Sequence, residues 1–266
     1  MSPPTIPSPT LKVLTPVPLS HASFQPYGTA VASPISPTLN NAPTSISSLP
    51  SHPTAPILAN QGSAVKYSPI SPIENTYGSG KSRLSGAPCM SMFSCFPRKL
   101  RPDSDNKDKR NKISGLFDVQ ILERHPYTSQ TFIPFSYGRD FPDSSGEVPV
   151  YLVIVAPTLT GQTAIGSVES SDGSCERKSV LIHDPPDLNN LRAFLALPGQ
   201  AVTYAAGTWH APMVVLGKRR IDFLVVQFVN GIDEEDCQEV QFEKGVAVKI
   251  DETNRINDQE TGKAKL

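Results

Sequence analysis

Charge is scarce at the start of the chain. The first fifty residues contain one charged side chain, Lys12, and are dominated by Pro, Ser and Thr. Such a segment lacks both the basic residues and apolar run of a secretory signal and the arginines of a transit peptide. The longest apolar run, Val148 to Pro157, is far shorter than the roughly 20 residues that span a bilayer. We therefore expect a soluble, cytoplasmic protein without a membrane partner.

Net charge and cysteine are also sparse. A formal net charge of -1 over 266 residues gives no electrostatic basis for binding nucleic acid. The four cysteines, Cys89, Cys95, Cys175 and Cys237, show neither zinc nor redox spacing. In a cytosolic chain the ordinary state of such cysteines is the reduced thiol. We expect free thiols and no nucleic-acid partner.

Helical periodicity is almost absent, and short strands take its place. Within Leu191 to Gly231, β-branched and aromatic segments alternate with Gly and Pro, a pattern typical of an antiparallel barrel or sandwich. The strands predicted here are Arg192–Leu197, Ala201–Tyr204, Pro212–Leu216 and Ile221–Val229. Further strands are predicted at Lys12–Leu14, Val119–Glu123, Gln130–Phe135, Val148–Val155 and Val240–Phe242. The fold class is therefore all-β, with long proline-rich insertions.

The ordered segments are separated by polar stretches that cannot bury a core of their own. We expect an N-terminal strand segment of the barrel at 1–32 and a disordered proline-rich insertion at 33–58. The barrel itself is predicted over 59–250, with flexible loops at 68–88, 101–111 and 158–187. Residues 251–266 form a flexible polar tail.

Two motifs resemble those of cupin barrels. The segment from Gly199 to His210 matches the second cupin motif at Gly199, Gly207 and His210, with Ala205 in place of a proline. The first motif is present in altered form in LERHPYTSQTFIPF, where Glu123 and His125 take the histidine positions and Gln130 that of the glutamate. The resemblance implies a cupin-like double-stranded β-helix barrel.

The amino-acid sequence of the ordered segments resembles that of the ureidoglycolate lyase family (also called ureidoglycolate hydrolase), in a fungal form with long insertions. The matching segments are FxPYG at Phe24–Gly28, NxGxxxxY at Asn60–Tyr67, ERHPxxxQxFIP at Glu123–Pro134, LRAF and GQxVxYxxGxWHxP within Leu191–Pro212, and DFLVV at Asp222–Val226. They cover roughly half of the chain. Ala211 replaces the second histidine of the WHHP motif, which puts any role of that histidine in doubt.

The resemblance implies an enzyme, an amidine-lyase type of carbon–nitrogen lyase. It would cleave (S)-ureidoglycolate to glyoxylate and urea in allantoin and purine degradation, and it would be a homodimer. Two alternatives stay open on the residues alone. One is a non-catalytic cupin barrel that binds a small organic acid, since fold does not fix function. The other is an interaction protein whose proline-rich insertions bind a partner.

Breaking a carbon–nitrogen bond of this kind requires a base, an acid and a group that binds the substrate carboxylate. His210 is the first catalytic candidate, followed by Glu123 and His125, which share a face of their strand by alternation. Gln130 can position substrate or water but cannot transfer a proton. Substrate-binding candidates are Tyr204, Arg98 and Asn60. For each of these except His210, a purely structural role is the alternative.

A divalent metal ion, nickel or manganese, is the cofactor that the resemblance implies. Its protein ligands would be Glu123, His125 and His210, because two imidazoles and a carboxylate suit such ions. Gln130 is a poor ligand for most of them. Proton transfer by the side chains alone is the alternative mechanism, and the sequence leaves the choice open.

Overall fold

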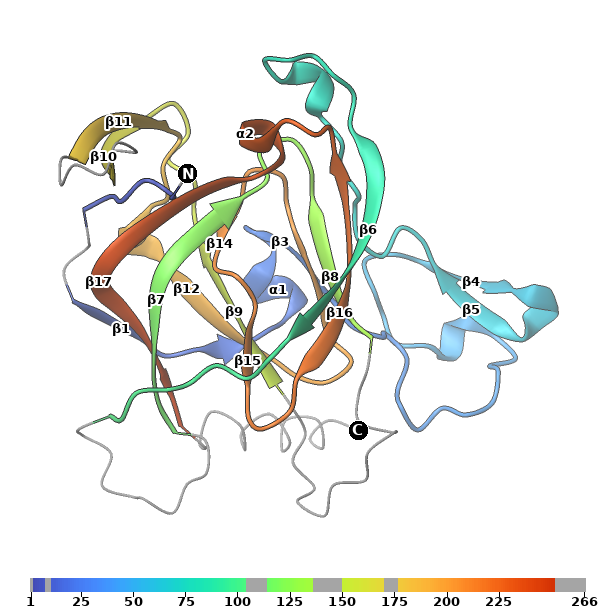
Figure 1. Cartoon of the computed structure of the whole chain (residues 1–266). Coiled ribbons are helices and arrows are strands. Elements are labelled where there is room, and N and C mark those ends of the chain that lie inside the picture. The colour runs from blue at the N-terminus through green and yellow to red at the C-terminus, as the bar shows by residue number, and fades with distance from the viewer. Residues whose placement is uncertain (1, 8–10, 104–113, 136–149, 170–176, 252–266) are drawn as a thin grey trace.

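The computed structural model describes residues 2–7, 11–103, 114–135, 150–169 and 177–251. Two large β-sheets face each other and curl into a barrel (Figure 1). The first, called sheet A, has the strand order β1-β17-β7-β14-β9-β12-β2, with β15 also paired to β9. The second, sheet B, has the order β3-β13-β8-β16-β6. The all-β, cupin-like barrel predicted from the sequence is confirmed.

The strands of sheet A are β1 (Lys12–Leu14), β2 (Val17–Pro18), β7 (Gly115–Arg124), β9 (Val150–Ala156), β12 (Arg192–Ala196), β14 (Trp209–His210), β15 (Val214–Leu216) and β17 (Gln238–Ile250). Those of sheet B are β3 (Gly28–Val31), β6 (Ala87–Cys95), β8 (Gln130–Pro134), β13 (Ala201–Tyr204) and β16 (Ile221–Val229). β13 and β16 have the predicted bounds, whereas β17 extends well beyond the predicted Val240–Phe242.

Helix is minor in the described chain. It consists of two four-residue helices, α1 (His21–Phe24) and α2 (Asp233–Asp236), and the 3-10 turns η1 (Ile46–Ser48), η2 (Asn60–Gly62), η3 (Tyr77–Ser79) and η4 (Leu188–Asn190). Within the described ranges, no helix has the length and apolar character needed to cross a membrane. Cys89, Cys95 and Cys237 are free thiols, as predicted, and Cys175 lies outside the described residues.

The central strand β9 explains how the core forms, because every one of its residues is buried. Side chains alternate across a strand, so Tyr151, Val153 and Val155 pack between the two sheets with residues of β13 and β16. Leu152 and Ile154 point to the opposite face and join a second core cluster with Trp209. A strand buried on both faces has to be a continuous apolar run, which is what VYLVIVA is.

Two hairpins lie outside the barrel (Figure 1). β4 (Pro56–Ala59) and β5 (Ala64–Tyr67) form an arm whose tip is η2. β10 (Thr163–Glu169) and β11 (Arg177–His183) form the other, within the stretch predicted to be a flexible loop. The sequence did not predict this hairpin, because its strands lack the regular alternation of apolar and polar residues that marks a core strand. In the structure its large apolar residues Ile165 and Leu181 are exposed, so they do not belong to a buried face.

The remaining boundaries stay predictions. The structure gives residues 33–55 no strand, only η1, and disorder of 33–58 is not decided by it. Most of the predicted loop 101–111 and nearly all of the tail 251–266 fall outside the described residues. The segment 68–88 contains Tyr77, which is fully buried and therefore part of the ordered barrel wall.

Candidate active site

The candidate site forms where β7 and β14 pair. His210 of β14 lies opposite Glu123 of β7 on one side and opposite Val155 of β9 on the other. Residues opposite each other in neighbouring strands share a face of the sheet. Val155 faces sheet B, so Glu123 and His210 do too. Arg124 and Trp209, one position along each strand, face the other side.

His210 is held from several directions. Its Nε2 lies 3.1 Å from Oε1 of Gln130 and 3.4 Å from Oε1 of Glu123. Its Nδ1 lies 3.0 Å from the backbone oxygen of Thr208. The ring of Tyr204 stacks on the imidazole with a centroid distance of 3.9 Å and an angle of 12°. His210 is 1% exposed, so these contacts fix its position.

His125 completes the cluster just beyond the end of β7. Its ring centroid is 5.6 Å from that of His210. Its Nδ1 lies 2.6 Å from the backbone oxygen of Asp236, at the end of α2. Its Nε2 is buried and has no hydrogen-bond partner in the described structure. A buried polar atom without a partner is unusual in a folded protein and calls for an explanation.

The tautomers of both histidines follow from these contacts. A carbonyl oxygen only accepts, so in each ring the Nδ1 that faces one carries the hydrogen. In the neutral form each Nε2 then presents a lone pair to the cluster. Oε1 of Gln130 is also an acceptor, because its amide nitrogen donates to Oε1 of Gln227 at 2.7 Å. With the Glu123 carboxylate, four acceptor groups converge, and a proton or a cation is needed among them.

A divalent metal ion fits this donor set. The ligand atoms of Glu123, His125 and His210 all lie within 4.8 Å of one another. Ligand bonds of about 2.1 Å place two ligand atoms no more than about 4.2 Å apart, so the widest pair would have to close slightly around an ion. The buried Nε2 of His125 is the atom that most clearly lacks a partner.

Burial and mutual charge shift the titration of the cluster. Burial raises the pKa of Glu123, but the hydrogen bond and charge of His210 and the charge of His125 outweigh it, and the pKa lies below its ordinary value. Burial, with the charge of His210, lowers the pKa of His125. Burial and the charge of Glu123 raise the pKa values of Tyr204 and Glu239. The carboxylate of Glu123 is therefore favoured in its ionised form.

The structure brings together five of the seven residues predicted from the sequence: Glu123, His125, Gln130, Tyr204 and His210. It does not bring Arg98 or Asn60 to them. The Arg98 guanidinium lies 5.3 Å from the ring centroid of Phe117, near the start of β7, whereas Glu123 lies at its end. Asn60 lies in η2 at the tip of the β4–β5 arm. Arg98 follows a proline and Asn60 lies in a loop, so neither belongs to a periodic sequence pattern from which its position could be predicted.

Several residues around the cluster were missed in the sequence. Gln227 fixes the amide of Gln130, and a signal for it existed: it follows Phe223 and Val225 on the inward face of β16, where a polar side chain needs a partner. Asp236 and Thr208 orient the two histidines through backbone oxygens, for which a sequence holds no signal. Glu239 lies opposite Glu123 in β17, which the predicted strand Val240–Phe242 left out.

Comparison with known proteins identifies the family of this chain. The family model described as ureidoglycolate lyase matches residues 11–249. The ureidoglycolate lyase of Saccharomyces cerevisiae is 35% identical over 192 residues, 70% of this chain and 78% of the relative. That of Schizosaccharomyces pombe is 32% identical over 194 residues, covering 73% and 82%. That of Burkholderia mallei is 26% identical over 216 residues, covering 81% and 82%. With its barrel and its match over most of its length, the chain belongs to the ureidoglycolate lyase family.

Proposed function

We propose that this chain cleaves (S)-ureidoglycolate to glyoxylate and urea, with Glu123, His125, Gln130 and His210 as its active site. One observation carries the assignment of the site. Nε2 of His210 lies between oxygens of Glu123 and Gln130, so residues from three strands meet at one buried point. The relatives named for this activity support the reaction. They favour an enzyme over a non-catalytic barrel that binds an organic acid.

The reaction moves one proton. The substrate hydroxyl loses its proton, the oxygen forms the carbonyl of glyoxylate, and the electron pair of the C–N bond leaves on the urea nitrogen, which gains a proton. Glu123 suits both transfers, because its side chain is 20% exposed while His210 beside it is 1% exposed. Its carboxylate takes the hydroxyl proton and returns it to the departing nitrogen. His210 and Gln130 hold the carboxylate and the substrate in place.

A nickel or manganese ion would be held by Glu123, His125 and His210, and it would act as a Lewis acid toward the substrate hydroxyl or carboxylate oxygen. Glu123 has two carboxylate oxygens, so one could bind the ion while the other accepts the proton. Dialysis against a strong chelator tests the ion. We expect activity to fall and to return with nickel or manganese. Full activity in protein that elemental analysis shows to be free of metal would contradict it.

The function is tested by glyoxylate release from ureidoglycolate. We expect turnover by the wild-type chain and at least a roughly 100-fold loss in His210→Ala, because this change removes both the imidazole that holds the Glu123 carboxylate and a ligand of the ion. His21→Ala is the matched control, because His21 is an exposed residue of α1. Near wild-type turnover in a folded His210→Ala protein would overturn the site. Absence of turnover in the wild type with every candidate metal would overturn the reaction.

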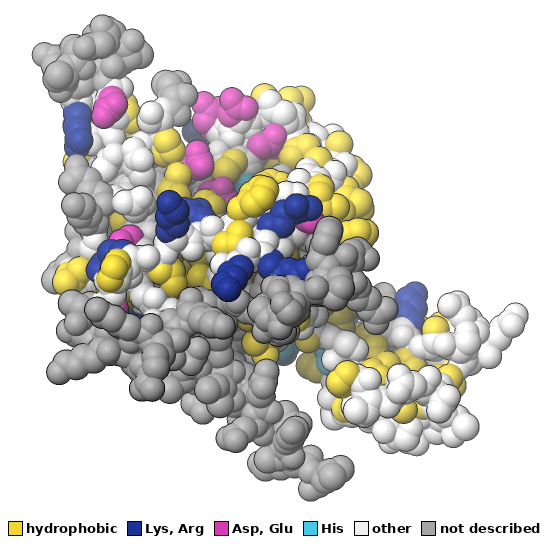
Figure 2. All heavy atoms as spheres, turned by 60° about the horizontal axis from the view of Figure 1, so that its bottom comes forward, with side chains coloured by type: hydrophobic (Ala, Val, Ile, Leu, Met, Phe, Trp, Pro, Cys, Tyr) yellow, Lys and Arg dark blue, Asp and Glu magenta, His cyan; other side chains and the backbone are white. Residues whose placement is uncertain are grey.

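We also propose that the chain is a homodimer that pairs through the outer face of sheet B. Met90 and Met92 of β6 are 67% and 52% exposed and lie opposite Val226 and Leu224 of β16. Ile133 of β8 is 38% exposed and extends this apolar face. The β4–β5 arm also carries hydrophobic side chains on its surface (Figure 2). Contiguous apolar surface of this kind marks interaction sites.

A cytoplasmic location stays a prediction.

A further inference from the structure

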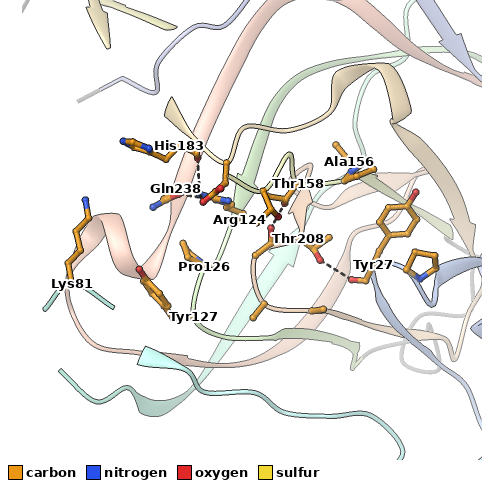
Figure 3. Close-up of a pocket in the computed structure, with 17 residues that line it drawn as sticks. Tyr27, Lys81, Arg124, Pro126, Tyr127, Ala156, Thr158, His183, Thr208 and Gln238 are labelled. Atoms are coloured by element: carbon orange, nitrogen blue, oxygen red, sulfur yellow. Dashed lines mark hydrogen bonds and ion pairs between the residues drawn. The ribbon is translucent and has the colours of Figure 1, made fainter. Parts of the chain in front are cut away.

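A pocket lies beside β7 and β14, and its labelled lining includes Arg124, Thr158 and Thr208 (Figure 3). Its volume is about 830 Å³, within the range of small-molecule sites. Arg124 and the segment from Ala205 to Thr208 contribute to its lining. A backbone hydrogen bond from Gly207 N to His125 O, 2.8 Å long, ties these two walls together. Neither Glu123 nor His210 is among the residues that line the pocket, so it is distinct from the point where these two side chains meet.

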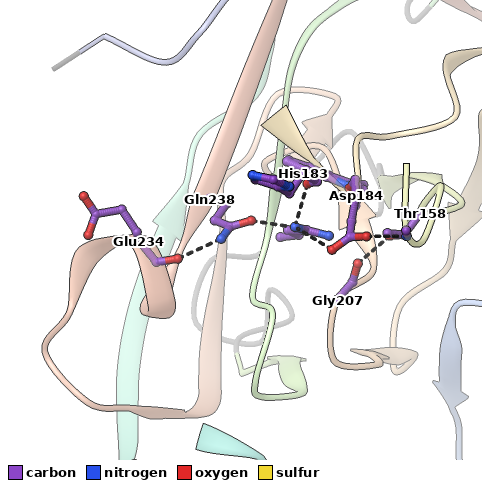
Figure 4. Close-up of polar contacts among 9 residues, drawn as sticks. Thr158, His183, Asp184, Gly207, Glu234 and Gln238 are labelled. Atoms are coloured by element: carbon purple, nitrogen blue, oxygen red, sulfur yellow. Dashed lines mark hydrogen bonds and ion pairs between the residues drawn. The ribbon is translucent and has the colours of Figure 1, made fainter. Parts of the chain in front are cut away.

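A buried cation faces this pocket. Arg124 is 5% exposed, and its guanidinium lies 4.9 Å from the ring centroid of Trp209. Its Nε donates to Oε1 of Gln238 at 2.9 Å and its Nη2 to the backbone oxygen of His183 at 3.0 Å. The two acceptors, an amide oxygen of Gln238 and a backbone oxygen of His183, carry no net charge; both residues are labelled in Figure 4. The nearest carboxylate described is that of Asp184, 3.8 Å from Nη2, which is too far for a hydrogen bond.

The charge of Arg124 is thus incompletely compensated. Asp184 is also engaged elsewhere, because its Oδ1 accepts from the backbone nitrogen of Gly161 at 2.6 Å. Removing a cation from water is unfavourable unless a close anion and hydrogen bonds replace the solvent. A guanidinium has five N–H groups, and the two bonds above use two of them. Lys81 adds a second cation to the pocket lining.

Small polar groups complete the wall. The hydroxyl of Thr158 donates to Gly207 O at 2.7 Å, and that of Thr208 to Tyr27 O at 3.1 Å. Each hydroxyl donor is used by a backbone oxygen, so the hydroxyls hold the pocket wall in shape. Tyr127 adds an aromatic surface beside Lys81 (Figure 3). The lining thus combines a buried guanidinium, an ammonium group on an exposed lysine and one carboxylate.

We propose that this pocket binds a small carboxylate, which pairs with the guanidinium of Arg124 and is attracted by the charge of Lys81 at the pocket wall. Arginine favours carboxylates because its planar N–H groups match the two oxygens of the ligand. The occupant contacts neighbours of the catalytic residues, since Arg124 follows Glu123 and Trp209 precedes His210. Asp184 is the residue that opposes binding, because its carboxylate competes for the same guanidinium.

Calorimetric titration of the chelator-treated protein with malonate, at constant ionic strength, tests the proposal. We expect saturable binding in the millimolar range or tighter, and no binding of the neutral analogue malonamide. Lys81→Ala should weaken binding several-fold and Arg124→Gln by about tenfold or more, the loss of a charge-assisted pair. Asp184→Asn should tighten it, which a purely structural role for Asp184 does not predict.

Two controls make the test decisive. Glu123→Gln and His210→Ala should leave malonate affinity unchanged, which separates this pocket from the catalytic cluster. If Arg124→Gln does not fold, Lys81→Ala and Asp184→Asn carry the test, because both residues lie at the pocket wall. The proposal is wrong if malonate does not bind, if Asp184→Asn fails to tighten binding, or if affinity is lost in the two catalytic variants instead.

Discussion

Glu123 and Gln130 both contact His210, yet their side chains have different chemical capacities. A carboxylate can accept and return a proton, whereas an amide can only position. We expect Glu123→Gln to lose at least about 100-fold in kcat. Gln130→Ala should lose about tenfold, the scale of an orienting partner. Steady-state glyoxylate release measures both.

The matched control for Glu123→Gln is Glu169→Gln, because Glu169 is an exposed residue of β10. It should retain wild-type kinetics. If Glu123→Gln kept full activity across the pH range, Glu123 would not be the proton-transfer residue and the mechanism above would fail.

Cys95, at the end of β6, gives a pH-dependent prediction at the residue scale. Burial, with the charge of Asp222, raises the pKa of its thiol. A raised pKa leaves less thiolate at a given pH, so alkylation by iodoacetamide should be slow and its midpoint should lie above the ordinary pH of about 8.5. Asp222→Asn removes the negative charge and should lower that midpoint. Peptide mass spectrometry over a pH series measures it, with Cys89 of the same strand as internal reference. A midpoint unchanged by Asp222→Asn would show that the charge has no effect.

At the scale of elements, α2 connects the barrel wall to the candidate active site. The carboxylate of Asp236 accepts from the Tyr77 hydroxyl at 2.6 Å and from backbone nitrogens of Asn230 and Gly231, both at 2.8 Å. Its backbone oxygen receives Nδ1 of His125. A helix of four residues has little stability of its own, so these side-chain contacts hold it in place and thereby set the orientation of His125.

Tyr77→Phe tests this connection. Losing a hydrogen bond to a charged group should lower the free energy of unfolding by about 1.5–3 kcal/mol, and the displaced Asp236 should lower kcat more than it changes KM. Tyr67→Phe is the control, because the Tyr67 hydroxyl is buried and has no hydrogen-bond partner among the described residues, so its removal should cost nothing. Chemical denaturation and kinetics of both variants are the measurements. Equal stability of the two variants would contradict the role of the Tyr77 hydroxyl.

At the scale of the whole molecule, the outer face of sheet B is the surface through which we propose that the chain dimerises. Met92→Glu places a charge in its middle, and we expect it to convert the dimer to a monomer at micromolar concentration. Leu181→Glu is the control: Leu181 is 58% exposed but lies on the β10–β11 hairpin, away from β6 (Figure 1). Light scattering during gel filtration measures both masses. A monomeric wild-type chain, or a dimeric Met92→Glu protein, would contradict this surface.

The sequence by itself determined the barrel and most of the residues of the candidate site. Strand periodicity is a local property, so β13 and β16 could be predicted to the residue, and alternation placed Glu123 and His125 on one face. The motif around Gly207 and His210 then identified a second strand of the site. Each of these inferences needed only neighbouring residues.

Tertiary structure alone decided how these residues are held and which others take part. The tautomers of His125 and His210 depend on backbone oxygens of Asp236 and Thr208, and any residue offers such an oxygen. Pairing of β14 with β7 brings residues far apart in the chain into contact, which no local pattern specifies. The same pairing turned Arg124 to the other face, over Trp209, where it faces a pocket that its sequence neighbours do not reveal.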